Sequence, residues 1–214
     1  MKVKLISLTQ VVGVPEVTTP EELIVYIARV SNPGNQTNMT TAPKLIRYLI
    51  DYKHWSPFEM VDITFEIETS RAISAQLIRH RSFSFQEFST RYSSVDRVEP
   101  IEMRLQAETN RQSSTTVTHE FDDLVESAVG LAFDLYNKML EEGVARETAR
   151  MILPMATQTR LYMKGSLRSW IHFLAVRDDE HAQKEAQLIA KEIKRELIKL
   201  FPNVAEALEW KNEN

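Results

Sequence analysis

Polar and apolar residues alternate with a period of two in two stretches of the chain. The clearer stretch covers residues 61–69, VDITFEIET, where every second side chain is apolar. This pattern predicts a β-strand, and polarity on one side only is typical of an antiparallel sheet with one covered face. Residues 2–9 alternate more weakly, with Val3, Leu5 and Ser7 on one side. We therefore expect another strand there.

Elsewhere apolar residues recur every three or four positions, which predicts helices. The first begins at Thr19-Pro20, because Thr19 can cap it, Pro20 suits its first turn and Glu22 completes a capping box. The longest covers residues 119–142, and Gly143 is a good stop signal. Further helices are expected over residues 43–52, 145–153, 167–174 and 180–201, and a short one ends near residue 80.

Helices thus outnumber strands in a chain of 214 residues, which is long enough for one substantial core. The expected fold class is α+β, with a small antiparallel sheet flanked by several helices in a single domain over residues 1–214. The last four residues, KNEN, are expected to be frayed.

Composition excludes several kinds of chemistry. The chain has no cysteine, which removes disulfides, thiolate metal sites and cysteine nucleophiles. The five histidines include no H-x-x-x-H pair, so we expect no metal site. The five glycines form neither G-x-G-x-x-G nor a phosphate-binding loop of the Walker type.

The formal net charge of −4 makes the chain as a whole a poor partner for nucleic acid, so an anion site must be a local cluster. No apolar run approaches the length of a membrane span, and the N-terminal residues do not resemble a signal peptide. The expected location is the cytoplasm, with no membrane partner.

Residues 79–91, RHRSFSFQEFSTR, combine arginines with aromatic residues. Arginine presents a rigid fork of donors that suits phosphate, and aromatic rings offer faces on which a base or a flavin can stack. The segment can therefore hold a nucleotide or dinucleotide. It can also be a surface hairpin with solvated arginines, or a stacking platform for single-stranded nucleic acid, although Glu87, Asp96 and the net charge disfavour the platform.

Further arginines follow in helical context. Arg146 and Arg150 are four residues apart, as are Arg168 and His172, and Arg177 closes the same predicted helix. Each set alone is typical of surface ion pairs. Together with residues 79–91, they indicate a site for an anionic ligand.

The chain resembles the flavin-dependent thymidylate synthases. The signature of that family, R-H-R followed by two spaced serines and R-Y, is matched by Arg79, His80, Arg81, Ser84, Ser89, Arg91 and Tyr92. The loop His54-x-Ser56-Pro57-Phe58-Glu59, the segment GVARETARMILP at residues 143–154 and residues 167–183 also match in order and spacing. The resemblance covers about residues 20–200.

This resemblance implies a homotetramer with active sites shared between subunits. It implies an enzyme that converts dUMP to dTMP, with methylenetetrahydrofolate donating the carbon and NADPH reducing FAD, which supplies the hydride. The absence of cysteine agrees, because the other type of thymidylate synthase attacks dUMP with a cysteine thiolate. A flavin cofactor carries the difficult chemistry, and the protein supplies binding and orientation.

The resemblance also assigns roles residue by residue. Residues implied for dUMP are Gln76, Arg79, Glu87, Ser89, Thr90, Arg91, Arg150 and Arg177. Residues implied for FAD are His54, Ser56, Arg79, His80, Arg81, Gln86, Glu87, Ser166, Arg168 and His172. The catalytic set is Arg177, Ser89 and His54. Arg177 would meet the pyrimidine edge and stabilise negative charge there, while His54 would lie near the flavin and the folate path.

Three positions depart from the family pattern: Met60 stands where His is common, and Gln86 and Ser166 stand where Asn is common. Ser89 is open to two roles. A serine nucleophile needs an adjacent base, and the motif offers only Glu87, so we favour a hydrogen bond that orients dUMP. A visible spectrum separates the enzyme from a nucleic-acid-binding module, because only the enzyme is yellow.

Overall fold

The computed structural model describes residues 1–211, and residues 212–214, which belong to the tail expected to be frayed, lie outside the described residues. In chain order, the elements are β1 (Lys2–Leu8), α1 (Pro20–Ala28), the 3-10 helices η1 (Pro33–Asn35) and η2 (Met39–Thr41), α2 (Ala42–Asp51), η3 (Ser56–Met60), β2 (Asp62–Ser70), α3 (Arg71–Leu77), β3 (Ser84–Glu87), β4 (Arg104–Gln106), β5 (Ser114–Val117), α4 (Asp122–Glu141), α5 (Arg146–Ala149), η4 (Arg150–Ile152), β6 (Gln158–Ser166), α6 (Leu167–Arg177), α7 (Lys184–Leu200) and α8 (Pro202–Ala207). The α+β class predicted from the sequence is confirmed.

The main sheet has the strand order β1-β2-β6-β3, and every neighbouring pair is antiparallel. β2 pairs with β6 along its whole length, from Asp62 opposite Ser166 to Ser70 opposite Gln158. The sequence did not predict β6, and this omission is a correction. Only two of its four buried positions, Leu161 and Met163, carry large apolar side chains, because Thr159 and Gly165 occupy the other two.

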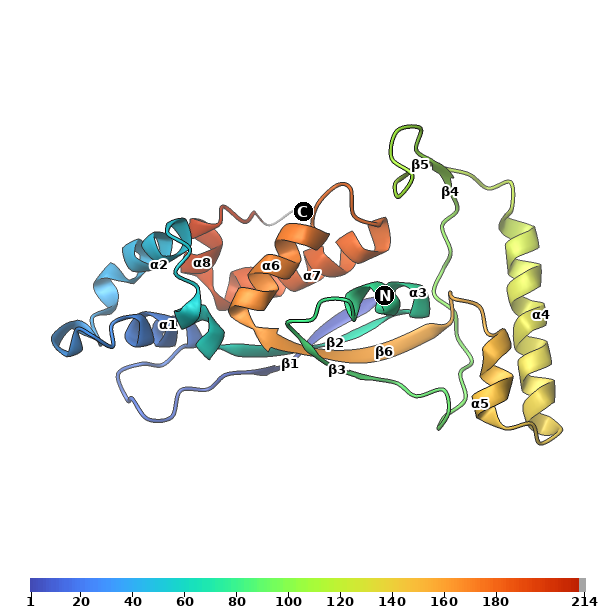
Figure 1. Cartoon of the computed structure of the whole chain (residues 1–214), viewed down its shortest axis with the longest axis horizontal. Coiled ribbons are helices and arrows are strands. Elements are labelled where there is room, and N and C mark those ends of the chain that lie inside the picture. The colour runs from blue at the N-terminus through green and yellow to red at the C-terminus, as the bar shows by residue number, and fades with distance from the viewer. Residues whose placement is uncertain (212–214) are drawn as a thin grey trace.

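One face of this sheet is covered, as the alternation in β2 predicted. α3, α6 and α7 lie over it, and α1, α2 and α8 gather at one end (Figure 1). The core on the covered side includes Phe65, whose ring centroid lies 5.1 Å from that of Trp170. The other face carries charged side chains, such as the ion pair of Lys164 with Asp62 at 2.6 Å.

Local signals in the N-terminal part were mostly correct. The capping box of α1 is present, because the Glu22 N–H donates to Thr19 Oγ1 at 3.1 Å and Glu22 Oε2 accepts from the Thr19 N–H at 3.0 Å. The expectation for Ser7 was wrong. A register shift between Leu5 and Ser7 leaves Ser7 exposed and brings Leu8 toward the core.

Two predicted helices in the C-terminal half are shorter than expected. The segment 145–153 forms one turn of α5 and a 3-10 turn, because Pro154 follows. The predicted helix over 180–201 begins only at Lys184, since Asp179 accepts the His181 N–H in a local turn at 2.8 Å. Pro202 then begins a separate helix, α8.

The long helix α4 stands beside α5, away from the sheet, at the right of Figure 1. Its amphipathic pattern was predicted, but its apolar stripe is largely uncovered within one chain. Leu124 is 68% exposed and Leu131 is 71% exposed, whereas Tyr136 is buried. No helix in residues 1–211 is long and apolar enough to cross a membrane.

Candidate active site

The turn after α3 carries Arg79, His80, Arg81 and Phe83, and it buries the phenylalanine while it exposes the arginines. The ring of Phe83 is buried, with its centroid 4.6 Å from that of Trp170 and 6.1 Å from that of Phe173. Arg79 and Arg81 on the same turn are exposed. The buried ring therefore fixes the turn to the core and leaves the guanidinium groups at the surface, where a ligand can reach them.

α6 brings the later predicted residues to this turn. It begins where β6 ends, and Ser166 caps it by accepting the Ser169 N–H at 3.3 Å. At its other end, Arg177 Nε donates to His80 Nε2 at 2.8 Å, and Arg177 Nη2 donates to the Gln76 carbonyl at 3.3 Å. Arg177 thus meets two other predicted residues, His80 and Gln76, which lie 97 and 101 positions before it in the sequence.

The electrostatics of this point favour a neutral histidine beside arginines. Burial, then the charge of Arg177 and of His172, lowers the pKa of His80 to about 4. Burial, then the charge of Arg79, lowers the pKa of Arg177. The imidazole is therefore uncharged at neutral pH, and the excess positive charge around it favours an anionic ligand.

A cavity of about 550 Å³ lies between η3 and α6. Its lining residues are Trp55, Glu59, Ser82, Arg168, Ser169, Ile171, His172 and Ala175. Two residues predicted for FAD, Arg168 and His172, are among them, and Arg168 forms an ion pair with Glu59. An apolar wall beside a guanidinium group and an imidazole suits a ligand that combines flat rings with phosphates.

Two other residues predicted for FAD lie on the segment before this cavity. Ser56 begins η3, the same 3-10 helix that carries Glu59. His54 is exposed, and its ring centroid lies 5.8 Å from that of Tyr48 and 6.3 Å from that of Tyr52.

Glu87 lies at the end of β3, where two hydroxyl groups hold it. Ser74 Oγ and Thr159 Oγ1 each donate to Glu87 Oε1 at 2.9 Å, and Arg71 Nη1 lies 3.9 Å from the same oxygen. Both hydroxyl donors bond one oxygen, so the other oxygen, Oε2, is the acceptor left for a ligand. No sequence pattern pointed to Ser74, which lies in α3, or to Thr159, which lies in the unpredicted strand β6.

The remaining residues predicted for dUMP lie where the loop after β3 contacts the segment that contains α5 and η4. Arg150 Nη1 donates to Thr90 Oγ1 at 3.2 Å, and Arg91 forms an ion pair with Glu147 at 3.3 Å. A shallow cavity of about 360 Å³ is lined here by Ser89, Arg91, Tyr92, Ala145, Arg146 and Glu147. The residues predicted for dUMP therefore include one group at Arg177 and another at Ser89, while Glu87 is bonded to Ser74 of α3.

The departures from the family pattern have distinct environments. Ser166 uses its hydroxyl to cap α6. Gln86 is exposed on β3, opposite Tyr162 of β6. Met60, at the end of η3, is also exposed.

Arg81, another residue predicted for FAD, is exposed on the turn after α3, so it is open to a ligand.

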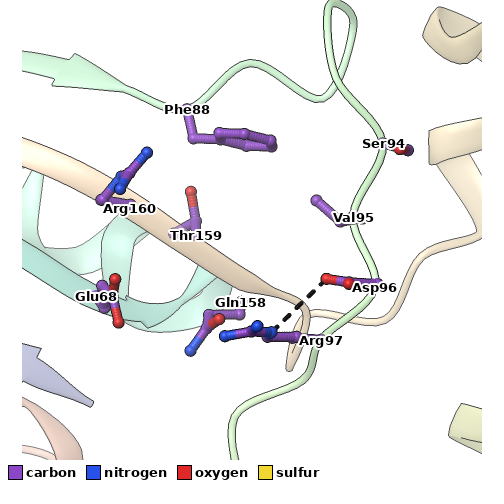
Figure 2. Close-up of a pocket in the computed structure, with 9 residues that line it drawn as sticks. All are labelled: Glu68, Phe88, Ser94, Val95, Asp96, Arg97, Gln158, Thr159 and Arg160. Atoms are coloured by element: carbon purple, nitrogen blue, oxygen red, sulfur yellow. Dashed lines mark ion pairs between the residues drawn. The ribbon is translucent and has the colours of Figure 1, made fainter.

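A separate pocket of about 240 Å³ lies at the start of β6 (Figure 2). Phe88 and Val95 point toward each other across it, and the Asp96–Arg97 ion pair, at 3.8 Å, lies at its side. The residues drawn in Figure 2 include none of those predicted for dUMP or FAD. We therefore do not assign this pocket to the site.

The chain is similar to known proteins over nearly its whole length. Residues 14–203 match the family model Thy1, described as thymidylate synthase complementing protein. The chain is 49% identical over 217 residues to a flavin-dependent thymidylate synthase of Synechocystis sp. and 48% identical over 216 residues to a probable flavin-dependent thymidylate synthase of Paramecium bursaria Chlorella virus 1; each match covers 98% of this chain and 100% of the relative.

A solved structure is also similar. The crystal structure of the UMP/dUMP methylase PolB from Streptomyces cacaoi, bound with 5-Br dUMP, superposes with a TM-score of 0.81 at 30% identity. The superposition covers 97% of this chain and 94% of that one.

Proposed function

We propose a function from one premise: the chain belongs to the family of flavin-dependent thymidylate synthases. The reaction is the reductive methylation of dUMP to dTMP. Methylenetetrahydrofolate is the carbon donor, NADPH is the reductant, and bound FAD, once reduced, supplies the hydride. No cysteine nucleophile takes part, because the chain contains no cysteine. The whole chain, residues 1–214, serves as one domain.

The observation that carries this proposal is the hydrogen bond between Arg177 and His80. Arg177 belongs to the residues proposed for dUMP, and His80 belongs to those proposed for FAD. Their contact brings the substrate side and the cofactor side together, as hydride transfer between two bound molecules requires. Arg177 has further N–H donors with which it can bind the pyrimidine edge and stabilise negative charge on it.

The residues around the larger cavity fit FAD. Trp55, Ile171 and Ala175 offer apolar surface for a flat ring, while Arg168, His172 and Ser82 offer donors for a diphosphate or a carbonyl. His54, on the exposed edge beside Tyr48 and Tyr52, lies where the folate approaches.

The second group of residues suits the phosphate end of dUMP. Arg91, Arg146 and the Ser89 hydroxyl line one shallow cavity, and Arg150 is fixed nearby through Thr90. Charge-assisted bonds from arginine to phosphate are short and strong. Glu87 presents its free oxygen as an acceptor for a hydroxyl or N–H of a ligand, and Ser89 orients dUMP rather than attacking it.

The enzyme is a homotetramer with shared active sites. Support comes from α4, whose exposed stripe includes Leu124, Leu131 and Leu135. Apolar surface of this kind is typical of an interface between chains, and α4 stands apart from the body of its own chain (Figure 1). A cytoplasmic location without membrane or nucleic-acid partners completes the proposal.

A flavin titration followed by a single turnover tests the function. The purified protein should show flavin absorbance or take up FAD, and FMN should bind more weakly because it lacks the adenylate. Reduced flavin should then be reoxidised anaerobically with formation of dTMP when dUMP and methylenetetrahydrofolate are both added, and not when dUMP is left out. A colourless protein that binds oligonucleotides in a salt-dependent way, or equal affinity for FMN and FAD, would contradict the proposal.

A further inference from the structure

Arg177 is the last residue of α6, and two protein acceptors fix its guanidinium group. Nε donates to His80 Nε2 at 2.8 Å, and Nη2 donates to the Gln76 carbonyl at 3.3 Å. These bonds hold both the plane and the direction of the fork. The N–H groups that remain on the terminal nitrogens are the ones available to a ligand.

The direction of the first bond fixes the protonation of His80. A guanidinium group is always protonated in proteins and can only donate. His80 Nε2 must therefore be the unprotonated nitrogen, and the proton of the neutral ring must be on Nδ1. The edge contacts of the ring with Phe173, at 5.1 Å, and with Phe83, at 6.3 Å, hold the imidazole in place.

We propose that His80 is a positioning residue for Arg177, and that Arg177 in turn holds His80 in the tautomer with its proton on Nδ1. The inference rests on the proposed function in one respect: Arg177 must contact the pyrimidine of dUMP. Each residue thereby prepares the other for a different ligand. Arg177 is directed before dUMP arrives, and His80 presents an Nδ1–H donor on the side away from Arg177.

This arrangement makes dUMP affinity depend on a residue assigned to the cofactor. A guanidinium group that is already oriented loses less conformational freedom when the substrate binds. Without the imidazole acceptor, the long Arg177 side chain samples other rotamers, and its neighbour Arg79 repels it. Loss of His80 should therefore weaken dUMP binding even when FAD is saturating.

The first test measures the tautomer directly and needs no activity. Solid-state nitrogen-15 NMR of protein labelled in the histidine imidazoles, recorded at neutral pH, should show protonated Nδ1 for His119 and His181, whose Nδ1 atoms face carboxylates. It should show one further Nδ1–H signal, from His80. That signal should be absent from His80→Gln and retained in the control His119→Gln, whose site on the N-terminal side of α4 is remote. In Arg177→Ala the signal should shift toward a mixture of tautomers. An Nε2–H tautomer for the ring whose signal His80→Gln removes, or no change in that signal in Arg177→Ala, would overturn the inference.

The second test is a double-mutant cycle on dUMP binding to protein saturated with FAD. Binding is measured from the change that dUMP causes in the flavin spectrum. His80→Leu and Arg177→Ala should each raise the dissociation constant about tenfold to a hundredfold. The double variant should be no more than about twofold worse than Arg177→Ala, because residues that act through one another are not additive.

His80→Gln should recover part of the loss, since its amide oxygen can accept from Arg177 where Nε2 does. Additive effects in the cycle, or an equal loss for the Gln and Leu variants, would overturn the inference. Failure of the wild type to bind dUMP would instead contradict the proposed function, and the NMR test would still decide the pairing of His80 with Arg177.

Discussion

Gly165 lies directly against the ring of Phe83: a Cβ atom added to Gly165 would lie 2.5 Å from Cδ1 of that ring. Gly165 is in β6, and Phe83 is in the turn that carries Arg79, His80 and Arg81. Because Gly165 has no side chain, the ring of Phe83 can pack directly against β6, and this packing holds the turn of the proposed active site in place. The same ring touches Trp170 and Phe173 of α6, so strand, turn and helix meet at one packed cluster.

Substitution Gly165→Ala should therefore destabilise the protein and loosen the turn. The buried ring of Phe83 cannot move aside cheaply, and overpacking of a core typically costs about 1–3 kcal/mol. Urea unfolding should show this loss, and FAD affinity should fall because His80 shares the turn. Gly13→Ala is the control, since its Cβ would meet nothing within 4 Å. Unchanged stability of Gly165→Ala would show that Phe83 is not held there.

Substitution Ser89→Ala separates orientation of dUMP from covalent catalysis. If Ser89 orients dUMP, the variant loses one hydrogen bond worth about 1.5–3 kcal/mol, and dUMP use should slow about tenfold to a hundredfold. Single-turnover reoxidation of reduced flavin, with dTMP measured, gives the rate. Normal dUMP binding with no dTMP at all would instead support a nucleophilic Ser89.

Substitution Arg177→Ala should slow dTMP formation more than Ser89→Ala does. It removes both a positive charge and the partner of His80, and Arg177→Lys should rescue only in part, because an ammonium group cannot reproduce the planar fork. Reduction of bound FAD by NADPH should persist in Ser89→Ala and in Arg177→Ala. A fully active Arg177→Lys would show that charge alone is sufficient.

Neighbouring carboxylates in α1 should give opposite pH dependence of stability. Burial is the main cause that raises the pKa of Glu21, whose carboxylate accepts the Val204 N–H at 2.9 Å and Asn203 Nδ2 at 2.7 Å. The hydrogen bond from the Thr18 backbone is the main cause that lowers the pKa of Glu22. A raised pKa favours folding of the protonated form, so its contribution is lost as the pH rises through the folded pKa.

Relative to Glu21→Gln, the wild type should therefore lose stability as the pH rises from about 4 to 7, the range above the ordinary carboxyl pKa. Relative to Glu22→Gln, it should lose stability as the pH falls below that ordinary value, because a lowered pKa contributes stability only to the ionised form. Melting temperatures of the three proteins, measured at pH values both below and above the ordinary carboxyl pKa, provide the test. Slopes of the same sign for both pairs would contradict the assignment.

A charge in the exposed stripe of α4 should disrupt assembly. Leu131→Glu places a carboxylate on the apolar surface proposed to pack against another chain, and an unpaired buried charge is strongly unfavourable. Light scattering should give a mass of about four chains for the wild type and a smaller mass for the variant, with less dTMP formed. Val12→Glu is the control, because Val12 is 92% exposed in a loop. A fully active monomer would contradict shared sites.

Features that depend on residues close together in the chain could be predicted from the amino-acid sequence. The alternation in β2 predicted its covered face, and Thr19 with Glu22 predicted the start of α1, because strand polarity and helix caps are set within a few residues. The spacing of Arg79, His80, Arg81, Ser89 and Arg91 was enough to indicate the family. Lack of cysteine also excluded a thiolate mechanism, because composition is the same in every fold.

Contacts between distant residues were set by the tertiary structure. β6 was not predicted because two positions of its covered face, Thr159 and Gly165, are not large apolar residues. Thr159 is buried because it donates a hydrogen bond to Glu87, and Gly165 is buried because the ring of Phe83 packs against it. His80 and Arg177 are 97 positions apart, and no local pattern specifies their bond. Whether the stripe of α4 faces its own core was likewise set by the path of the chain, since periodicity fixes the faces of a helix and not what covers them.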